Sequence, residues 1–162
     1  MKAIITTPSL VPVIQTIKNE PCGASIKHVV TLGPAQGCHN FSDMLNVDYS
    51  STNFIKGDDI NPLEEPAIIY WSSGTTGPPK GTILTHANIC SHVLARSIPQ
   101  VSAYTPGKET LTGVIPFFHV FGGTSLTFTA IYQGSKVVSL EKFDSNLFAK
   151  LLQTHKVQIL TN

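Results

Sequence analysis

The chain has 162 residues, of which 41% are hydrophobic and 13% are charged. That length and composition suit one domain with a hydrophobic core and leave too little chain for two large domains. Lys and Arg together number 11 against 10 for Asp and Glu, a balance that argues against nucleic acid or an anionic membrane surface as a partner.

The first half of the chain alternates short apolar runs typical of strands with periodic stretches typical of helices. We predict strands over residues 2–6 and 26–32, a helix over residues 10–18 and a short helix over residues 41–45. The polar residues 46–65 predict an irregular connection. This alternation is typical of an α/β fold with a doubly wound, mostly parallel sheet and flanking helices.

The most informative stretch follows a predicted strand over residues 67–72. Residues 70–81 read Tyr-Trp-Ser-Ser-Gly-Thr-Thr-Gly-Pro-Pro-Lys-Gly, so glycines, Ser and Thr hydroxyls and one lysine are gathered in one loop. Close backbone N–H groups, hydroxyls and a positive charge together suit a polyphosphate. The loop is not a Walker A loop, because Pro79 precedes Lys80 and Gly81 follows it, and it lacks the Rossmann fingerprint. A solvated Ser/Thr/Gly turn is the alternative interpretation.

A second short strand over residues 82–86 and a helix over residues 87–96 follow the loop. His86, Cys90 and His92 fall close together there, and the first two could share a metal ion. A structural zinc site usually needs four ligands, and no second cluster supplies the rest. We therefore predict no metal site.

A strand predicted over residues 111–115 ends in Pro-Phe-Phe-His-Val-Phe-Gly-Gly, in which His119 is the histidine. A lone histidine in an apolar stretch is usually a core or turn residue.

The remaining chain predicts helices over residues 126–133 and 146–155 and strands over residues 135–140 and 157–161. Residues 110–135 carry no charged side chain and could span a bilayer by length alone, but their Pro, Gly, Thr and Gln residues favour a buried strand, turn and helix.

Residues 70–81 closely resemble the signature of the adenylate-forming (AMP-binding) superfamily, which includes acyl-CoA synthetases, 4-coumarate:CoA ligases, luciferases and peptide-synthetase adenylation domains. Every defined position of the family pattern Tyr-x-Ser-Ser-Gly-Thr-Thr-Gly-x-Pro-Lys-Gly is matched. The resemblance implies that the loop binds the β- and γ-phosphates of ATP and that Lys80, as a catalytic residue, steadies the closed loop. The residues it assigns to the phosphates are Ser72, Ser73, Gly74, Thr75, Thr76, Gly77, Lys80 and Gly81.

The string around His119 resembles the second motif of the same superfamily and follows the first by about forty residues, as the family requires. This resemblance implies that His119 is a catalytic residue beside the carboxylate that is activated. It further implies that His119, Phe121, Gly122 and Gly123 contribute to the wall of the substrate pocket.

The resemblance runs along the whole chain but covers only the central part of the family's large N-terminal domain. We therefore expect residues 1–162 to be a partial domain, without the downstream motif that holds the α-phosphate and Mg²⁺ and without the C-terminal domain. The full-length relative is expected to be an acid–thiol ligase that uses ATP, Mg²⁺ and coenzyme A to activate a fatty acid or a 4-coumarate-type acid, and the isolated chain is expected to be inactive.

Other interpretations are a luciferase-like or peptide-synthetase adenylation domain, a non-catalytic nucleotide-binding module and a remnant that does not fold. Three cysteines and the lack of a secretory signal lead us to expect free thiols and an intracellular protein, either cytoplasmic or peroxisomal.

Overall fold

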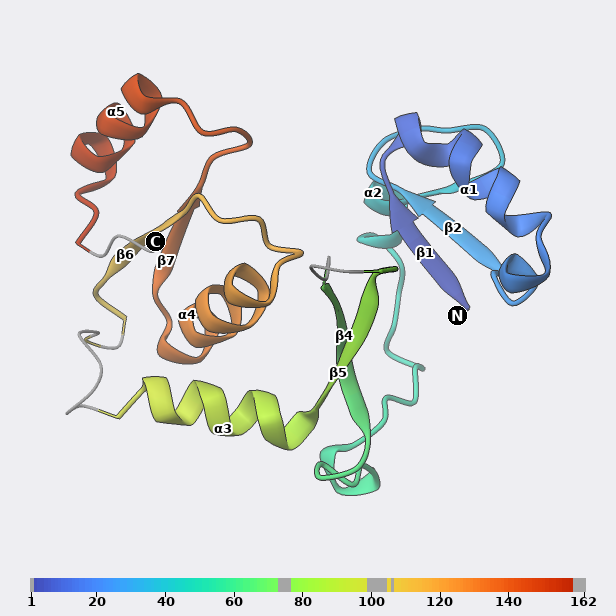
Figure 1. The fold of residues 1–162 in the computed structure, drawn as a ribbon, viewed down its shortest axis with the longest axis horizontal. Coiled ribbons are helices and arrows are strands. Elements are labelled where there is room, and N and C mark those ends of the chain that lie inside the picture. Colours follow the sequence, from blue (N-terminus) through green and yellow to red (C-terminus); the bar gives the residue numbers. More distant parts are fainter. Residues whose placement is uncertain (1, 73–76, 99–104, 106, 159–162) are drawn as a thin grey trace. The chain divides into compact units, whose positions relative to one another are not determined.

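The computed structural model describes residues 2–72, 77–98, 105 and 107–158. The contacts between residues divide the chain into two compact units, Met1–Phe54 and Ile55–Asn162. Figure 1 labels the helices and strands of both units.

The first unit is a small parallel sheet with helices in its connections (Figure 1). Its elements are β1 (Ala3–Thr6), η1 (Pro8–Leu10), α1 (Val11–Lys18), η2 (Pro21–Gly23), β2 (His28–Thr31), β3 (His39–Asn40) and α2 (Phe41–Met44). Strand β2 lies in the middle and pairs in parallel with both neighbours. Its residues Val29, Val30 and Thr31 are buried, so β2 forms the centre of this unit.

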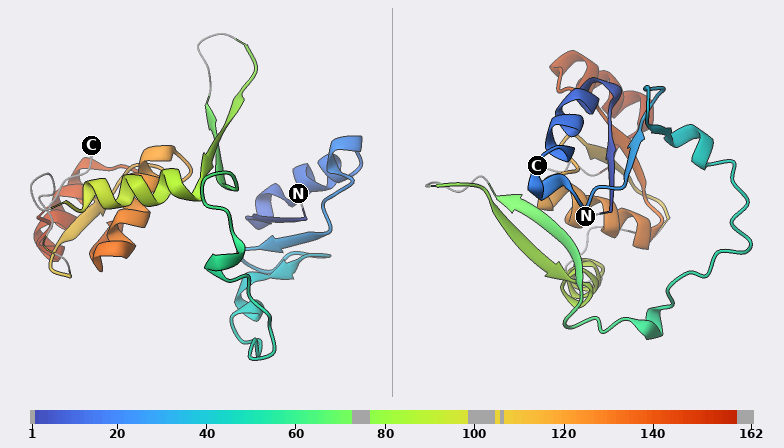
Figure 2. Two further views of the ribbon diagram at one scale, coloured as in Figure 1. Left: turned by 90° about the horizontal axis from the view of Figure 1, so that it is seen from below. Right: turned by 90° about the vertical axis from the view of Figure 1, so that its right-hand side faces the viewer.

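The second unit contains an antiparallel hairpin, a parallel strand pair and the helices around them (Figures 1 and 2). Its elements are η3 (Gly57–Asp59), β4 (Pro66–Ser72), β5 (Lys80–Thr85), α3 (His86–Arg96), β6 (Thr110–Gly113), η4 (Phe121–Phe128), α4 (Thr129–Gln133), β7 (Lys136–Ser139) and α5 (Ser145–His155). Strands β4 and β5 form the hairpin, and α3 begins directly after β5.

Strands β6 and β7 are joined by a helical crossover and run parallel to each other. The crossover starts as the π-helix η4 and continues as α4. Leu111 of β6, Leu126 of η4 and Ala130 of α4 are almost completely buried, with 1%, 1% and 2% of their surface exposed. This strand–helix–strand packing forms the core of the unit and sets the position of the turn between β6 and η4.

The predicted α/β class with parallel strands and flanking helices is confirmed. In the part of the chain that the structure describes, the strands lie in three separate sheets: one of three strands and two of two strands. Residues 157 and 158 are not in a strand, and residues 159–161 of the predicted last strand lie outside the described residues. Gln158 nevertheless contacts β6, because its backbone N–H donates to the Thr110 carbonyl oxygen at 3.1 Å.

The charge-free stretch from residue 110 to 135 folds as β6, a turn, η4 and α4. Among the described residues, no helix is long and apolar enough to cross a membrane.

Candidate functional site

The glycine-rich stretch is held at the open end of the β4–β5 hairpin. Ser72, the last residue of β4, lies opposite Lys80, the first residue of β5. The Ser72 hydroxyl donates a hydrogen bond to the Lys80 carbonyl oxygen at 3.3 Å. Gly77 has a φ angle of +98°, a conformation that L-residues with side chains rarely adopt. The hairpin therefore closes the loop at its base and brings the first and last polar residues of the predicted phosphate site together.

Four of the predicted phosphate-binding residues, Ser73, Gly74, Thr75 and Thr76, lie outside the described residues. The other four, Ser72, Gly77, Lys80 and Gly81, are all exposed to solvent.

Pairing in the hairpin determines which side chains share a face. Residues opposite each other in an antiparallel pair point to the same side, and the side alternates along each strand. Tyr70 pairs with Thr82, and Ser72 pairs with Lys80 two residues further along. Lys80 therefore projects from the face of the hairpin that carries Tyr70, Ser72 and Thr82.

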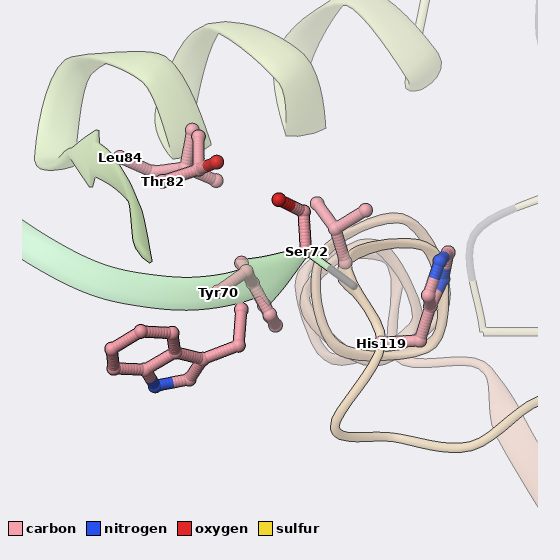
Figure 3. A pocket seen from close by; sticks show the side chains of 7 residues that line it. Tyr70, Ser72, Thr82, Leu84 and His119 are labelled. Atoms are coloured by element: carbon pink, nitrogen blue, oxygen red, sulfur yellow. The ribbon is translucent and has the colours of Figure 1, made fainter. Parts of the chain in front are cut away.

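That face borders a pocket of about 150 Å³ whose opposite wall includes His119 (Figure 3). The residues that line it are Tyr70, Trp71, Ser72, Thr82, Leu84, His119 and Val120. Ser72, at the base of the predicted phosphate loop, and the predicted catalytic His119 thus line one pocket, although they are separated by more than forty residues of sequence. This arrangement lets one ligand contact both groups.

His119 lies in the exposed turn that connects β6 to η4. Its backbone N–H donates to the Pro116 carbonyl oxygen at 3.0 Å, and its own carbonyl oxygen accepts from the Gly123 N–H at 2.8 Å. The Phe121 N–H donates to the ring atom Nδ1 of His119 at 3.2 Å. Because Nδ1 accepts this bond, a neutral His119 carries its proton on Nε2, which can then donate to a ligand oxygen.

Gly122 and Gly123 permit close packing at the start of η4. A Cβ atom on Gly122 would lie 2.4 Å from the Pro116 carbonyl oxygen, and one on Gly123 would lie 2.1 Å from the Tyr70 hydroxyl. Both glycines therefore bring the helix against neighbouring groups that a side chain would push away. Their predicted contribution to a substrate wall, with that of the half-buried Phe121, remains a prediction.

Tyr70 and Thr124 are functional candidates that the sequence reasoning missed. The Thr124 hydroxyl donates to the Tyr70 hydroxyl at 3.2 Å, which joins η4 to β4. Tyr70 belongs to the signature string, but nothing in the local pattern indicates its partner 54 residues away. Only the alternation of β4, which puts Tyr70 and Ser72 on one face, could have drawn attention to it.

One of the two histidines near α3 has a structural partner. His92 Nε2 shares a hydrogen bond of 2.9 Å with the Ser125 hydroxyl and so joins α3 to η4. The Thr85 hydroxyl accepts from the Asn88 N–H and the Asn88 side chain accepts from the Thr85 N–H, a capping box that starts α3. Within the described ranges, no three His, Cys, Asp or Glu residues lie close enough to hold a metal ion.

Two curated relatives show what the chain is similar to in sequence. A probable 4-coumarate–CoA ligase 1 from Dictyostelium discoideum is 33% identical over 139 residues, which are 85% of this chain and 24% of that protein. A long-chain-fatty-acid–CoA ligase from Bacillus subtilis is 31% identical over 118 residues, which are 73% of this chain and 20% of that protein. The chain thus spans about a quarter of the length of these curated relatives.

Solved structures share the fold at lower identity. A red-emitting luciferase from Phrixothrix hirtus matches with a TM-score of 0.79 and 24% identity, over 98% of this chain and 30% of that one. The ATP-bound MatB from Rhodopseudomonas palustris matches with a TM-score of 0.75 and 24% identity, over 98% of this chain and 29% of that one. The AMP-binding enzyme family matches residues 1–162, both units included. The chain belongs to the AMP-binding enzyme family.

Proposed function

We propose that the full-length protein activates a carboxylic acid with ATP and transfers the acyl group to coenzyme A. In the first step a carboxylate oxygen attacks the α-phosphate of ATP, which forms an acyl-adenylate and releases pyrophosphate. In the second step the thiol of coenzyme A attacks the acyl carbon, which gives a thioester, AMP and a proton. The names of the relatives, 4-coumarate–CoA and long-chain-fatty-acid–CoA ligases, support coenzyme A as the acceptor and an aromatic or fatty acid as the substrate.

The observation that carries the proposal is the shared pocket. Ser72 and Lys80 close the loop on one face of the hairpin, and the pocket on that face is lined by His119. A phosphate chain held by the loop would therefore lie within reach of groups on the turn before η4. A structural hairpin alone would not require a lysine at the loop base and a histidine across the pocket.

In this proposal the loop binds the β- and γ-phosphates of ATP. Lys80 supplies a charge-assisted hydrogen bond, and the Ser72 hydroxyl can turn from the Lys80 carbonyl oxygen to a phosphate oxygen. The signature string supports Ser73, Gly74, Thr75, Thr76 and Gly77 as further phosphate-binding residues. Negative charge that moves onto the leaving pyrophosphate would be stabilised by these donors.

His119 acts on the other reactant. With Nδ1 occupied by the Phe121 N–H, the Nε2–H group donates to an oxygen of the substrate carboxylate and orients the other oxygen for attack. Phe121, Gly122 and Gly123 are proposed to form the adjoining part of the acyl site.

The described residues do not fit a resident metal centre, since they hold no cluster of three His, Cys, Asp or Glu side chains. No residue in this part of the chain is therefore assigned to Mg²⁺. We propose only that the ion arrives as the complex of Mg²⁺ with ATP.

The test is carboxylate-dependent exchange of labelled pyrophosphate into ATP by the full-length protein, first without coenzyme A. The acids compared are 4-coumarate, a long-chain fatty acid and phenylalanine. Exchange with one of the first two acids, followed by thioester formation when coenzyme A is added, is the expected result. Exchange with phenylalanine and no thioester would instead support a peptide-synthetase adenylation domain, and no exchange with any acid would contradict the proposal.

A further inference from the structure

The hydroxyl of Tyr70 is held between two parts of the second unit. It accepts a hydrogen bond from Thr124 Oγ1 at 3.2 Å. It also occupies the space where a side chain at Gly123 would be, since a Cβ atom there would lie 2.1 Å from this oxygen. Thr124 has 4% of its surface exposed and Tyr70 is half-buried, so the bond is partly shielded from water. One side chain of β4 therefore contacts two successive residues of η4.

The two elements that Tyr70 joins carry the two halves of the proposed site. On β4, Tyr70 shares a face with Ser72, which closes the phosphate loop with Lys80. On η4, Gly123 donates its N–H to the His119 carbonyl oxygen at 2.8 Å, so Gly123 and His119 belong to one turn. A shift of Tyr70 relative to Gly123 would move the histidine relative to the loop.

We propose that Tyr70 is a positioning residue that sets the spacing between Ser72, at the base of the phosphate loop, and His119, with Thr124 and Gly123 as its partners on η4. The inference rests on the proposed function, in which ATP phosphates and the carboxylate must meet between these two groups. Tyr70 lines the same pocket, and its hydroxyl oxygen accepts the hydrogen bond that joins β4 to η4, which gives Tyr70 a role in orienting other groups.

The experiment compares Tyr70→Phe and Thr124→Val with Ser125→Ala in the full-length protein. Tyr70→Phe keeps the ring and removes only the hydroxyl. Ser125→Ala is the matched control, because it removes a hydrogen bond from the neighbouring residue of η4 that leads to His92 on α3 and leaves the hairpin untouched.

We expect Tyr70→Phe to lower kcat for pyrophosphate exchange by about tenfold with little change in the KM for ATP, since small displacements of reacting groups strongly slow reactions. Thr124→Val should give a similar loss, and the double variant should be no slower than either single variant, because each removes the same bond. Ser125→Ala should leave kcat unchanged. Equal kcat values for Tyr70→Phe and wild type, or equal losses in Tyr70→Phe and Ser125→Ala, would overturn the proposal.

Hydrogen exchange provides a readout that does not depend on activity. Tyr70→Phe should speed exchange of the Gly123 amide, which donates to His119, while the amides of α3 keep their wild-type rates. Unchanged exchange at Gly123 would overturn the positioning role even in an active enzyme. If the wild-type protein shows no pyrophosphate exchange but Tyr70→Phe still speeds hydrogen exchange at the Gly123 amide, the proposed function is contradicted. The contact between β4 and η4 is then supported.

Discussion

Replacement of Gly122 by alanine tests whether close backbone packing builds the turn that carries His119. Gly122 is buried, and an added Cβ would lie 2.4 Å from the Pro116 carbonyl oxygen, 2.9 Å from the Pro116 carbonyl carbon and 3.2 Å from the Ile115 carbonyl oxygen. All three atoms belong to the backbone, so no flexible side chain can move aside. The turn itself has to shift by about 1 Å to reach an ordinary contact of 3.4 Å.

Overpacking of this kind costs about 1–3 kcal/mol. Alanine recovers about 0.5–1 kcal/mol relative to glycine inside a helix. From the middle of each range, the expected net loss in the free energy of unfolding is about 1.3 kcal/mol. Urea unfolding, followed by circular dichroism, measures this loss. For an m value of about 2 kcal/mol per M, the midpoint should fall by about 0.5–1 M.

Gly57→Ala is the control in the same unit. No heavy atom lies within 4 Å of a Cβ placed on Gly57, so its variant should unfold within about 0.5 kcal/mol of wild type. If Gly122→Ala and Gly57→Ala unfold at the same urea concentration, the packing argument for this turn is refuted.

Three further predictions concern the loop lysine, a helix cap and an exposed carboxylate. Lys80→Ala in the full-length protein should lower kcat/KM for pyrophosphate exchange by about 10²-fold. The control Lys142→Ala, at an exposed lysine, should have no effect. Equal kcat/KM values for the two variants would count against a phosphate role for Lys80. Thr85→Ala should destabilise the chain to urea by about 1 kcal/mol through loss of the α3 cap, a loss that Thr85→Ser should largely avoid. Two hydrogen bonds from Ser50, first the backbone bond and then the side-chain bond, lower the pKa of Asp48. The stability that this carboxylate contributes is therefore complete above the ordinary pKa of Asp. It is lost as the pH falls through the lowered pKa. Ser50→Ala removes only the side-chain bond and should raise the midpoint of the Asp48 titration in carboxyl NMR, and an unchanged midpoint would contradict the side-chain contribution.

The hairpin and its loop could be predicted because several local signals agree there. The apolar run before Ser72, the glycines of the loop and the short strand after Lys80 all indicate strand, turn and strand, and the structure has β4 and β5 at these places. The helix after β5 was also predictable, and its observed start at His86 is one residue earlier than expected because Thr85 and Asn88 form a capping box.

The start of the helix after His119 was predicted five residues too late. Gly122 and Gly123 are poor helix formers, so local preference favours a helix that begins only at Leu126. The structure begins η4 at Phe121, since the same glycines allow close packing against Pro116 and Tyr70. Tertiary contacts override local helix propensity here. The wider π-helical turn is often found at functional sites, but it carries no recognisable sequence signal.

Contacts between distant residues were the least predictable part of the site. The Tyr70–Thr124 bond and the His92–Ser125 bond each join residues more than thirty positions apart. Neither periodicity nor a motif indicates such partners, because the contacts depend on how the β6–η4 turn packs against the hairpin and α3. Strand β3 was missed for a simpler reason: two residues, His39 and Asn40, are too short to give an alternating pattern.

The most direct test of the proposed chemistry follows an oxygen atom. The full-length protein is given ATP, coenzyme A and the acid that supports pyrophosphate exchange, with both of its carboxyl oxygens labelled with ¹⁸O. AMP is analysed by mass spectrometry after thioester formation. Attack of the carboxylate on the α-phosphate predicts one ¹⁸O atom in each AMP, because the bridging oxygen of the acyl-adenylate stays with the phosphate when the thiol attacks. Label in inorganic phosphate with formation of ADP, or AMP without label, would contradict activation through an acyl-adenylate.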